Sequence, residues 1–233
     1  MRSLTGINVI DNINLFLDGD GEKNKGRHKE ERYASFDYCF NYFQAFRKRN
    51  CIEKLCNPEN MQQSCLQIAF FLASWGMFRG ASPLLQKSSK FYNQLIETIA
   101  ETNGSRLWRI DLPYDNDDID LLIKAKEDFH NALEKSLEKK ASQILVTKIM
   151  LGVYGNVPAF DNYFTKGLNV CKFNRKNLEK VSDFYLKNKQ EIDNYKPIYT
   201  LDFHTGKSTK LKYTKAKIVD MVGWIQGVKL QEN

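Results

Sequence analysis

The sequence has few of the residues that hold metals or disulfides. Its 233 residues include five cysteines and three histidines, and no Cys-x-x-Cys pair occurs. An odd number of thiols without paired spacing argues against a disulfide framework and against a structural zinc site. No histidine lies at ligand spacing from a cysteine. We therefore expect reduced thiols, no metal and no cofactor, as in a cytoplasmic protein.

A long apolar run is also missing. The most apolar window, Ile68–Phe78, is far shorter than the roughly 20 residues that cross a bilayer. Residues 1–17 lack the continuous apolar segment of a secretory signal. There is no repeat of fixed period and no low-complexity tract. These absences predict a soluble, cytoplasmic protein without a membrane partner, and we expect a monomer.

Several common catalytic motifs do not occur. The chain has no H-E-x-x-H, no G-x-S-x-G and no G-x-G-x-x-G, which argues against a zinc protease, a serine hydrolase and a dinucleotide enzyme. Gly206-Lys207-Ser208 resembles the end of a phosphate-binding loop, but Leu201 occupies the position of the first glycine. We reject that motif as well.

Basic residues are in excess. Lys and Arg number 35 against 28 for Asp and Glu, which gives a formal net charge of +7. This balance favours a polyanionic partner such as DNA, and a generic basic soluble protein is the alternative. The C-terminal part contains a group of lysines that could neutralise phosphates, namely Lys207, Lys210, Lys212, Lys215 and Lys217.

Hydrophobic periodicity predicts a mainly all-α fold. The expected helices cover residues 35–49, 59–74, 83–100, 118–139, 143–151, 174–189 and 215–226. Residues 197–213 predict a β-hairpin near the C-terminus. In the second helix, Leu66, Ala69, Phe70 and Ala73 form the expected apolar face. We expect a single domain, 1–233, as a two-lobed helical bundle. Its lobes cover about 1–102 and 115–233, residues 103–118 link them, and a cleft lies between them.

The most informative stretch is residues 141–167. An apolar helical run ends at a break between Gly152 and Gly155, and Val157-Pro158-Ala159-Phe160-Asp161 follows. A carboxylate at the start of the next helix is either a helix N-cap or a catalytic group. Both interpretations stay open at the level of the sequence.

This stretch resembles the helix-hairpin-helix DNA glycosylase superfamily, and within it the 8-oxoguanine branch. The resemblance rests on Thr147-Lys148-Ile149-Met150 and on V-P-A-F-D, which ends at Asp161, where members carry V-P-V-D or P-I-W-D. It covers about residues 140–168. It implies an enzyme that cleaves the N-glycosidic bond of a flipped base in duplex DNA, in repair or in phage defence.

The resemblance also implies roles for individual residues. Asp161 would stabilise the sugar cation that forms as the base leaves. Bifunctional members add a lysine at the position of Ser142, and Lys140 is the nearest upstream lysine. The expected base-binding residues are Phe160, Tyr163, Asn162 and Trp75, because a flipped base is stacked in a pocket. The expected contacts to the DNA backbone are Arg79, Lys148, Lys166, Lys172 and Arg175.

The sequence departs from this family at the hairpin. Members carry glycines just before the lysine, whereas residues 137–142 contain none. Two other interpretations are therefore kept beside the glycosylase. One is a non-enzymatic, basic α-helical protein that binds nucleic acid or an acidic partner, and the other is a helical effector or toxin.

Overall fold

The computed structural model describes residues 6–22, 24–137 and 141–232. This part of the chain is 64% helical with ten α-helices, which confirms the mainly α fold. The helices are α1 (Val9–Asp18), α2 (Ala34–Lys48), α3 (Pro58–Ser74), α4 (Asn93–Ala100), α5 (Asn116–Leu137), α6 (Gln143–Tyr154), α7 (Asn162–Gly167), α8 (Arg175–Lys187), α9 (Lys189–Asn194) and α10 (Lys215–Glu232). Four short 3-10 helices, η1 (Ile52–Cys56), η2 (Pro83–Gln86), η3 (Ser89–Tyr92) and η4 (Arg106–Trp108), lie between them. None of the described helices is both long and apolar enough to cross a bilayer.

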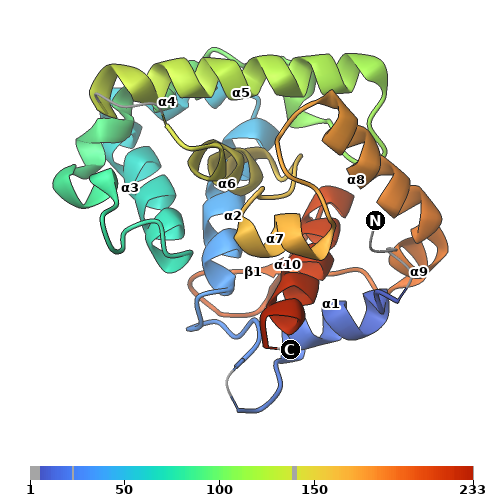
Figure 1. Cartoon of the computed structure of the whole chain (residues 1–233). Helices are drawn as coiled ribbons and strands as arrows, with labels where there is room; N and C mark the ends of the chain where they lie inside the picture. The colour runs from blue at the N-terminus through green and yellow to red at the C-terminus, as the bar shows by residue number, and fades with distance from the viewer. Residues whose placement is uncertain (1–5, 23, 138–140, 233) are drawn as a thin grey trace.

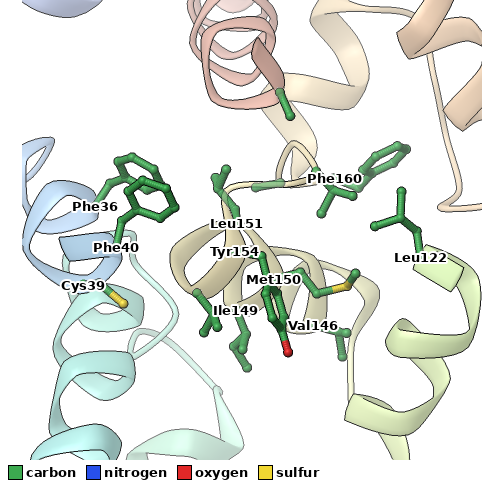
Figure 2. Close-up of a cluster of buried hydrophobic side chains, with 14 of the residues drawn as sticks. Phe36, Cys39, Phe40, Leu122, Val146, Ile149, Met150, Leu151, Tyr154 and Phe160 are labelled. Carbon is green, nitrogen blue, oxygen red and sulfur yellow. The ribbon is translucent and has the colours of Figure 1, made fainter. Parts of the chain in front are cut away.

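Helix α6 lies at the centre of the fold, with α5 along the top of the molecule and α2 next to α6 in the interior (Figure 1). All its residues from Leu145 to Tyr154 are buried, and Lys148 is the one charged residue among them. Figure 2 shows its apolar side chains between Phe40 of α2 and Leu122 of α5. Helix α3 also packs closely, since a Cβ atom on Gly152 would lie 2.8 Å from the Phe71 ring. The break after α6 is made by Gly155, which caps the helix in the left-handed conformation.

Helices α7 and α10 touch backbone to backbone, and Figure 1 shows them crossing in front of the core. A Cβ atom on Gly167 of α7 would lie 2.0 Å from the carbonyl oxygen of Gly223 in α10. So close a contact leaves no space for a side chain between the helices at this point. The start of α7 is therefore fixed relative to α10.

The predicted β-hairpin is present near the C-terminus. Strands β1 (Tyr199–Leu201) and β2 (Ser208–Lys212) pair antiparallel, with Tyr199 opposite Lys212 and Leu201 opposite Ser208. The hairpin is joined to α2 by the buried carboxylate of Asp37. That carboxylate accepts from the Leu201 N–H at 2.9 Å, from Arg27 at 3.0 Å and from the Tyr213 hydroxyl.

Three expected features of the N-terminal half differ in the structure. The helix expected over 83–100 is instead η2, η3 and α4, because Lys87 is extended and interrupts it. The segment 103–118, which was expected to link two lobes, is itself packed into the core. Leu107, Trp108, Ile110 and Leu112 are buried in a hydrophobic core that continues from α1 to α10.

The third difference is the face that α3 buries. Leu66 and Phe70 are 41% and 68% exposed, so the expected apolar face is wrong. The buried residues of α3 are Ser64, Cys65, Ile68, Phe71 and Leu72. Apolar residues at helical spacing occur on two faces of α3. The face that contains Ile68, Phe71 and Leu72 is buried, because it contacts α2 and α6.

Candidate active site

Asp161 is the N-cap of α7. Its Oδ1 accepts hydrogen bonds from the N–H groups of Tyr163 at 3.1 Å and Phe164 at 3.0 Å. These donors are among the N–H groups that a helix start leaves without partners, so the carboxylate stabilises α7. The residue is buried, with 8% of its surface exposed. Capping uses only one of its two carboxylate oxygens.

The second oxygen forms an ion pair with Lys148. The Lys148 Nζ lies 3.2 Å from Asp161 Oδ2, and the lysine is itself buried. The ammonium also donates to the Trp75 carbonyl oxygen at 3.3 Å and lies 5.4 Å from the centre of the Trp75 ring. A buried pair of this kind costs desolvation energy, and replacement by apolar residues is often no less stable. A plain helix cap does not require it.

The pair lies at the floor of a cleft of about 430 Å³. Aromatic residues from distant parts of the chain form its walls, namely Tyr33, Trp75, Tyr163 and Trp224. The Tyr33 and Trp75 rings are parallel within 9°, with centres 5.4 Å apart. Trp224 stands at 88° to Trp75, 5.7 Å away, and Tyr163 packs against it. Burial raises the pKa of Tyr33, which keeps its hydroxyl neutral at the wall.

Two arginines lie at the mouth of the cleft. The Arg32 guanidinium is 5.1 Å from the Tyr33 ring centre, 5.8 Å from Trp75 and 5.4 Å from Trp224. Arg79 folds over Gly76. Both arginines are exposed, and among the described residues neither has a carboxylate within ion-pair distance. Asp20 and Glu232 also line the cleft, so charges of both signs surround it, and the two arginines are the groups that could contact an anion.

A second buried ion pair lies beneath the cleft. Lys217 is 1% exposed, and its Nζ donates to Asp220 Oδ2 at 2.8 Å. The other oxygen, Oδ1, accepts from the Ala159 N–H at 2.9 Å. Lys217 also lies over the rings of Phe16, Phe36 and Trp75, at 4.9, 4.6 and 5.5 Å. The expectation that Lys217 could contact phosphate is wrong, because its ammonium is enclosed.

The structure brings some of the expected site residues together. Asp161, Trp75, Tyr163, Asn162 and Arg79 all line the cleft. Lys148 lines it too, but as the buried partner of Asp161, so its expected place on the DNA-binding surface is corrected. Lys140 lies outside the described residues.

Other expected residues lie elsewhere. Phe160 is 1% exposed and packs against Phe164 and Phe173, so it belongs to the core and not to the base pocket. Figure 2 shows it on the side of the core near Leu122. Its N–H donates to Thr147 Oγ1 at 2.9 Å, and the residue does not line the cleft. Arg175 is paired with Asp120 of α5, Lys166 donates to the Leu230 carbonyl oxygen, and Lys172 is exposed, all outside the cleft lining.

The sequence did not indicate Arg32, Tyr33 or Trp224 as parts of a site, nor the pairing of Lys217 with Asp220. One signal for the pair was available, because Asp220 stands within the apolar run Ile218–Ile225 at three residues from Lys217. Within the described residues, no group of three or more His, Cys, Asp or Glu side chains could hold a metal ion. Comparison of the chain with protein-family models, curated proteins and solved structures gave no match.

Proposed function

We propose that this protein is a DNA glycosylase-like hydrolase, which releases a damaged or modified base from DNA in repair or in defence against phage. The observation that supports this most is the Asp161–Lys148 pair at the floor of an aromatic cleft with arginines at its mouth. The cleft volume, about 430 Å³, is typical of small-ligand sites, which range over about 300–1,000 Å³. Its walls suit a planar ring, its mouth suits phosphate and its floor suits a cationic sugar.

The chemistry follows from the two floor residues. As the bond between C1′ and the base nitrogen breaks, its electron pair leaves with the base and positive charge develops on the sugar. The Asp161 carboxylate stabilises that charge. A water oxygen then bonds to C1′ and gives a proton to Asp161. The base nitrogen takes up a proton from solvent, and Asp161 returns its own proton to solvent, which restores the carboxylate. The products are the free base and an abasic site.

Lys148 acts in this scheme as the partner of Asp161. In an ion pair its nitrogen is an ammonium and has no free electron pair with which to attack C1′. Its contacts with Asp161 Oδ2 and with the Trp75 carbonyl oxygen hold the carboxylate in place. Among the described residues this leaves water as the nucleophile, and no covalent intermediate between Lys148 and DNA is expected.

The direct test is base release from duplex DNAs that carry a panel of modified bases, scored as strand breaks at abasic sites after alkali. Asp161→Asn retains an oxygen that can cap α7 but loses the charge. We expect its rate of base release to fall by about 100- to 1,000-fold, a typical effect of removing one electrostatic contact to a transition state. DNA binding should persist.

A matched control is Asn174→Ala, which removes the N-cap of α8 away from the cleft. It should cost about 1 kcal/mol of stability and leave base release unchanged. Equal activity in wild type and Asp161→Asn, or no base released from any of the DNAs, would sink the proposal. Borohydride provides a separate check of the nucleophile. A DNA–protein adduct after reduction would show that an amine, and not water, attacks.

A second candidate is a nucleic-acid-binding protein without catalysis. It is favoured by the exposed lysines of β2, Lys210 and Lys212, beside Lys207 and the 70% exposed Phe203 of the hairpin. Under this alternative, replacement of the hairpin lysines by Gln weakens DNA binding, and Asp161→Asn changes nothing that can be measured with DNA.

A further inference from the structure

The residues Lys217 and Asp220 are not explained by the capping of any helix or by the chemistry above. Both are buried, and Asp220 is 5% exposed. A folded protein gains little from such a pair compared with apolar residues of similar size. Its position is informative, however, because both ion pairs, Lys148–Asp161 and Lys217–Asp220, line the same small cavity between Trp75 and Trp224.

Asp220 is connected to Asp161 through the backbone. Its Oδ1 accepts from the N–H of Ala159, two residues before Asp161. The next N–H, of Phe160, donates to Thr147 Oγ1 of α6. Residues 157–160 have no regular secondary structure, so these two side chains provide the hydrogen bonds that a helix or strand would otherwise supply. Together they fix the short segment that carries the Asp161 carboxylate.

Lys217 in turn fixes Asp220. Its ammonium is held over three aromatic rings and donates to Asp220 Oδ2, which leaves Oδ1 directed at Ala159. Thr214 caps the helix that carries both residues, through the N–H of Lys217 at 3.1 Å. The order of contacts is thus Lys217, Asp220, Ala159 and then Asp161.

We propose that Asp220 is a positioning residue, which sets the Asp161 carboxylate at the cleft floor through the Ala159 N–H, and that Lys217 balances the buried charge of Asp220. This inference rests on the proposed function, because it assigns the pair a role in base release. Neither residue touches the substrate. Removal of the hydrogen bond to Ala159 lowers kcat and leaves KM unchanged, since the walls and the mouth of the cleft stay in place.

Two double variants separate positioning from simple packing. Lys217→Met with Asp220→Asn removes both charges and keeps an oxygen that can accept from Ala159. Lys217→Met with Asp220→Leu removes both charges and the acceptor. We expect kcat within about threefold of wild type for the Asn variant and a loss of tenfold or more for the Leu variant, with KM within about twofold for both. Equal kcat values in the two variants would overturn the inference.

If the Leu variant fails to fold, Ala159→Pro tests the same hydrogen bond, because proline has no N–H while Lys217 and Asp220 stay paired. We expect the same tenfold loss of kcat, and a wild-type kcat in Ala159→Pro would overturn the inference.

Amide hydrogen exchange distinguishes this inference from the proposed function. The Tyr163 and Phe164 N–H groups, which Asp161 caps, should exchange at least tenfold faster in the Leu variant and at the wild-type rate in the Asn variant. If wild type releases no base, the proposed function fails while exchange still decides whether the pair positions Asp161. Unchanged exchange in both variants would contradict the positioning role.

Discussion

Gly227 of α10 lies against the backbone of Tyr163 in α7, so closely that a Cβ atom on the glycine would be 1.9 Å from the Tyr163 carbonyl oxygen. Tyr163 is two residues after Asp161, and its N–H is one of the two that the carboxylate caps. The contact between α7 and α10 therefore restricts where the proposed catalytic carboxylate lies. Within this restricted position, the ion pair with Lys148 and the hydrogen bond from Ala159 to Asp220 orient the Asp161 carboxylate.

The first prediction concerns this contact. In Gly227→Ala the new methyl group pushes the backbone of α10 away from that of Tyr163 in α7. We therefore expect a loss of about 1–3 kcal/mol or more in the free energy of unfolding. Urea denaturation measures it. Gln231→Ala, at an exposed position of the same helix, should stay within about 0.5 kcal/mol of wild type. A Gly227→Ala protein as stable as wild type would show that α7 and α10 are not packed as described.

The second prediction is a double-mutant cycle on the pair beneath the cleft. Lys217→Met and Asp220→Leu each leave one buried charge without its partner, and each should cost about 3–5 kcal/mol of stability. The double variant should cost less than either single variant, because no buried charge remains. Thermal or urea unfolding of the four proteins gives the coupling energy. Strictly additive losses would mean that the two charges do not interact.

The third prediction is a pH dependence that originates at Asp37. Burial raises the pKa of Asp37 to about 6 although Arg27 opposes it, whereas 3.8 is the ordinary value of a carboxyl of this kind. The folded state thus holds the proton more tightly than the unfolded state. Protonated Asp37 therefore contributes about 3 kcal/mol to the free energy of unfolding below about pH 4. This contribution is lost as pH rises through about 6.

This dependence is measured as the stability of wild type minus that of Asp37→Asn across the pH range. The variant cannot titrate at this position, so other carboxylates cancel in the difference. The difference should decrease between about pH 4 and pH 6 and be flat above about pH 7. A difference that increases over that range would mean that Arg27 and Tyr213 outweigh burial in the folded protein.

The fourth prediction concerns the mouth of the cleft. Arg32 is exposed and its guanidinium rests on aromatic faces, so Arg32→Gln should fold normally. If the arginine contacts a DNA phosphate, the slope of log K against log salt becomes shallower by about 0.9. Binding to fluorescent duplex DNA at several salt concentrations measures the slope. Lys180→Gln, at an exposed position of α8, should leave the slope unchanged.

Local sequence signals predicted much of the secondary structure. Asn174 and Thr214 cap their helices through hydrogen bonds to the N–H groups of Asn177 and Lys217, as their residue types indicate. Asp161 was predicted at a helix start for the same reason, and its Oδ1 does cap α7. Signals of this kind depend on neighbours within four residues, so the sequence alone contains them.

The rest depends on contacts between distant segments. The walls of the cleft come from Tyr33, Trp75 and Trp224, which no spacing rule connects. The buried face of α3 and the interruption at Lys87 are decided by packing against other helices, which overrides the pattern along one helix. Packing also decided the role of Phe160. An aromatic residue next to a carboxylate suggested a binding-site residue, whereas its ring is buried in the core.

The floor and the walls of the cleft differ in how they are built. The floor depends on glycine contacts and on buried hydrogen bonds, where almost any substitution moves the backbone. Arg32, Tyr33, Trp75 and Arg79 lie on turns and helix ends around it. A change of wall residues can therefore alter which ring enters while the carboxylate stays where it is. Under the proposed function, substitutions at Arg32, Tyr33, Trp75 and Arg79 are therefore expected to change which base is preferred.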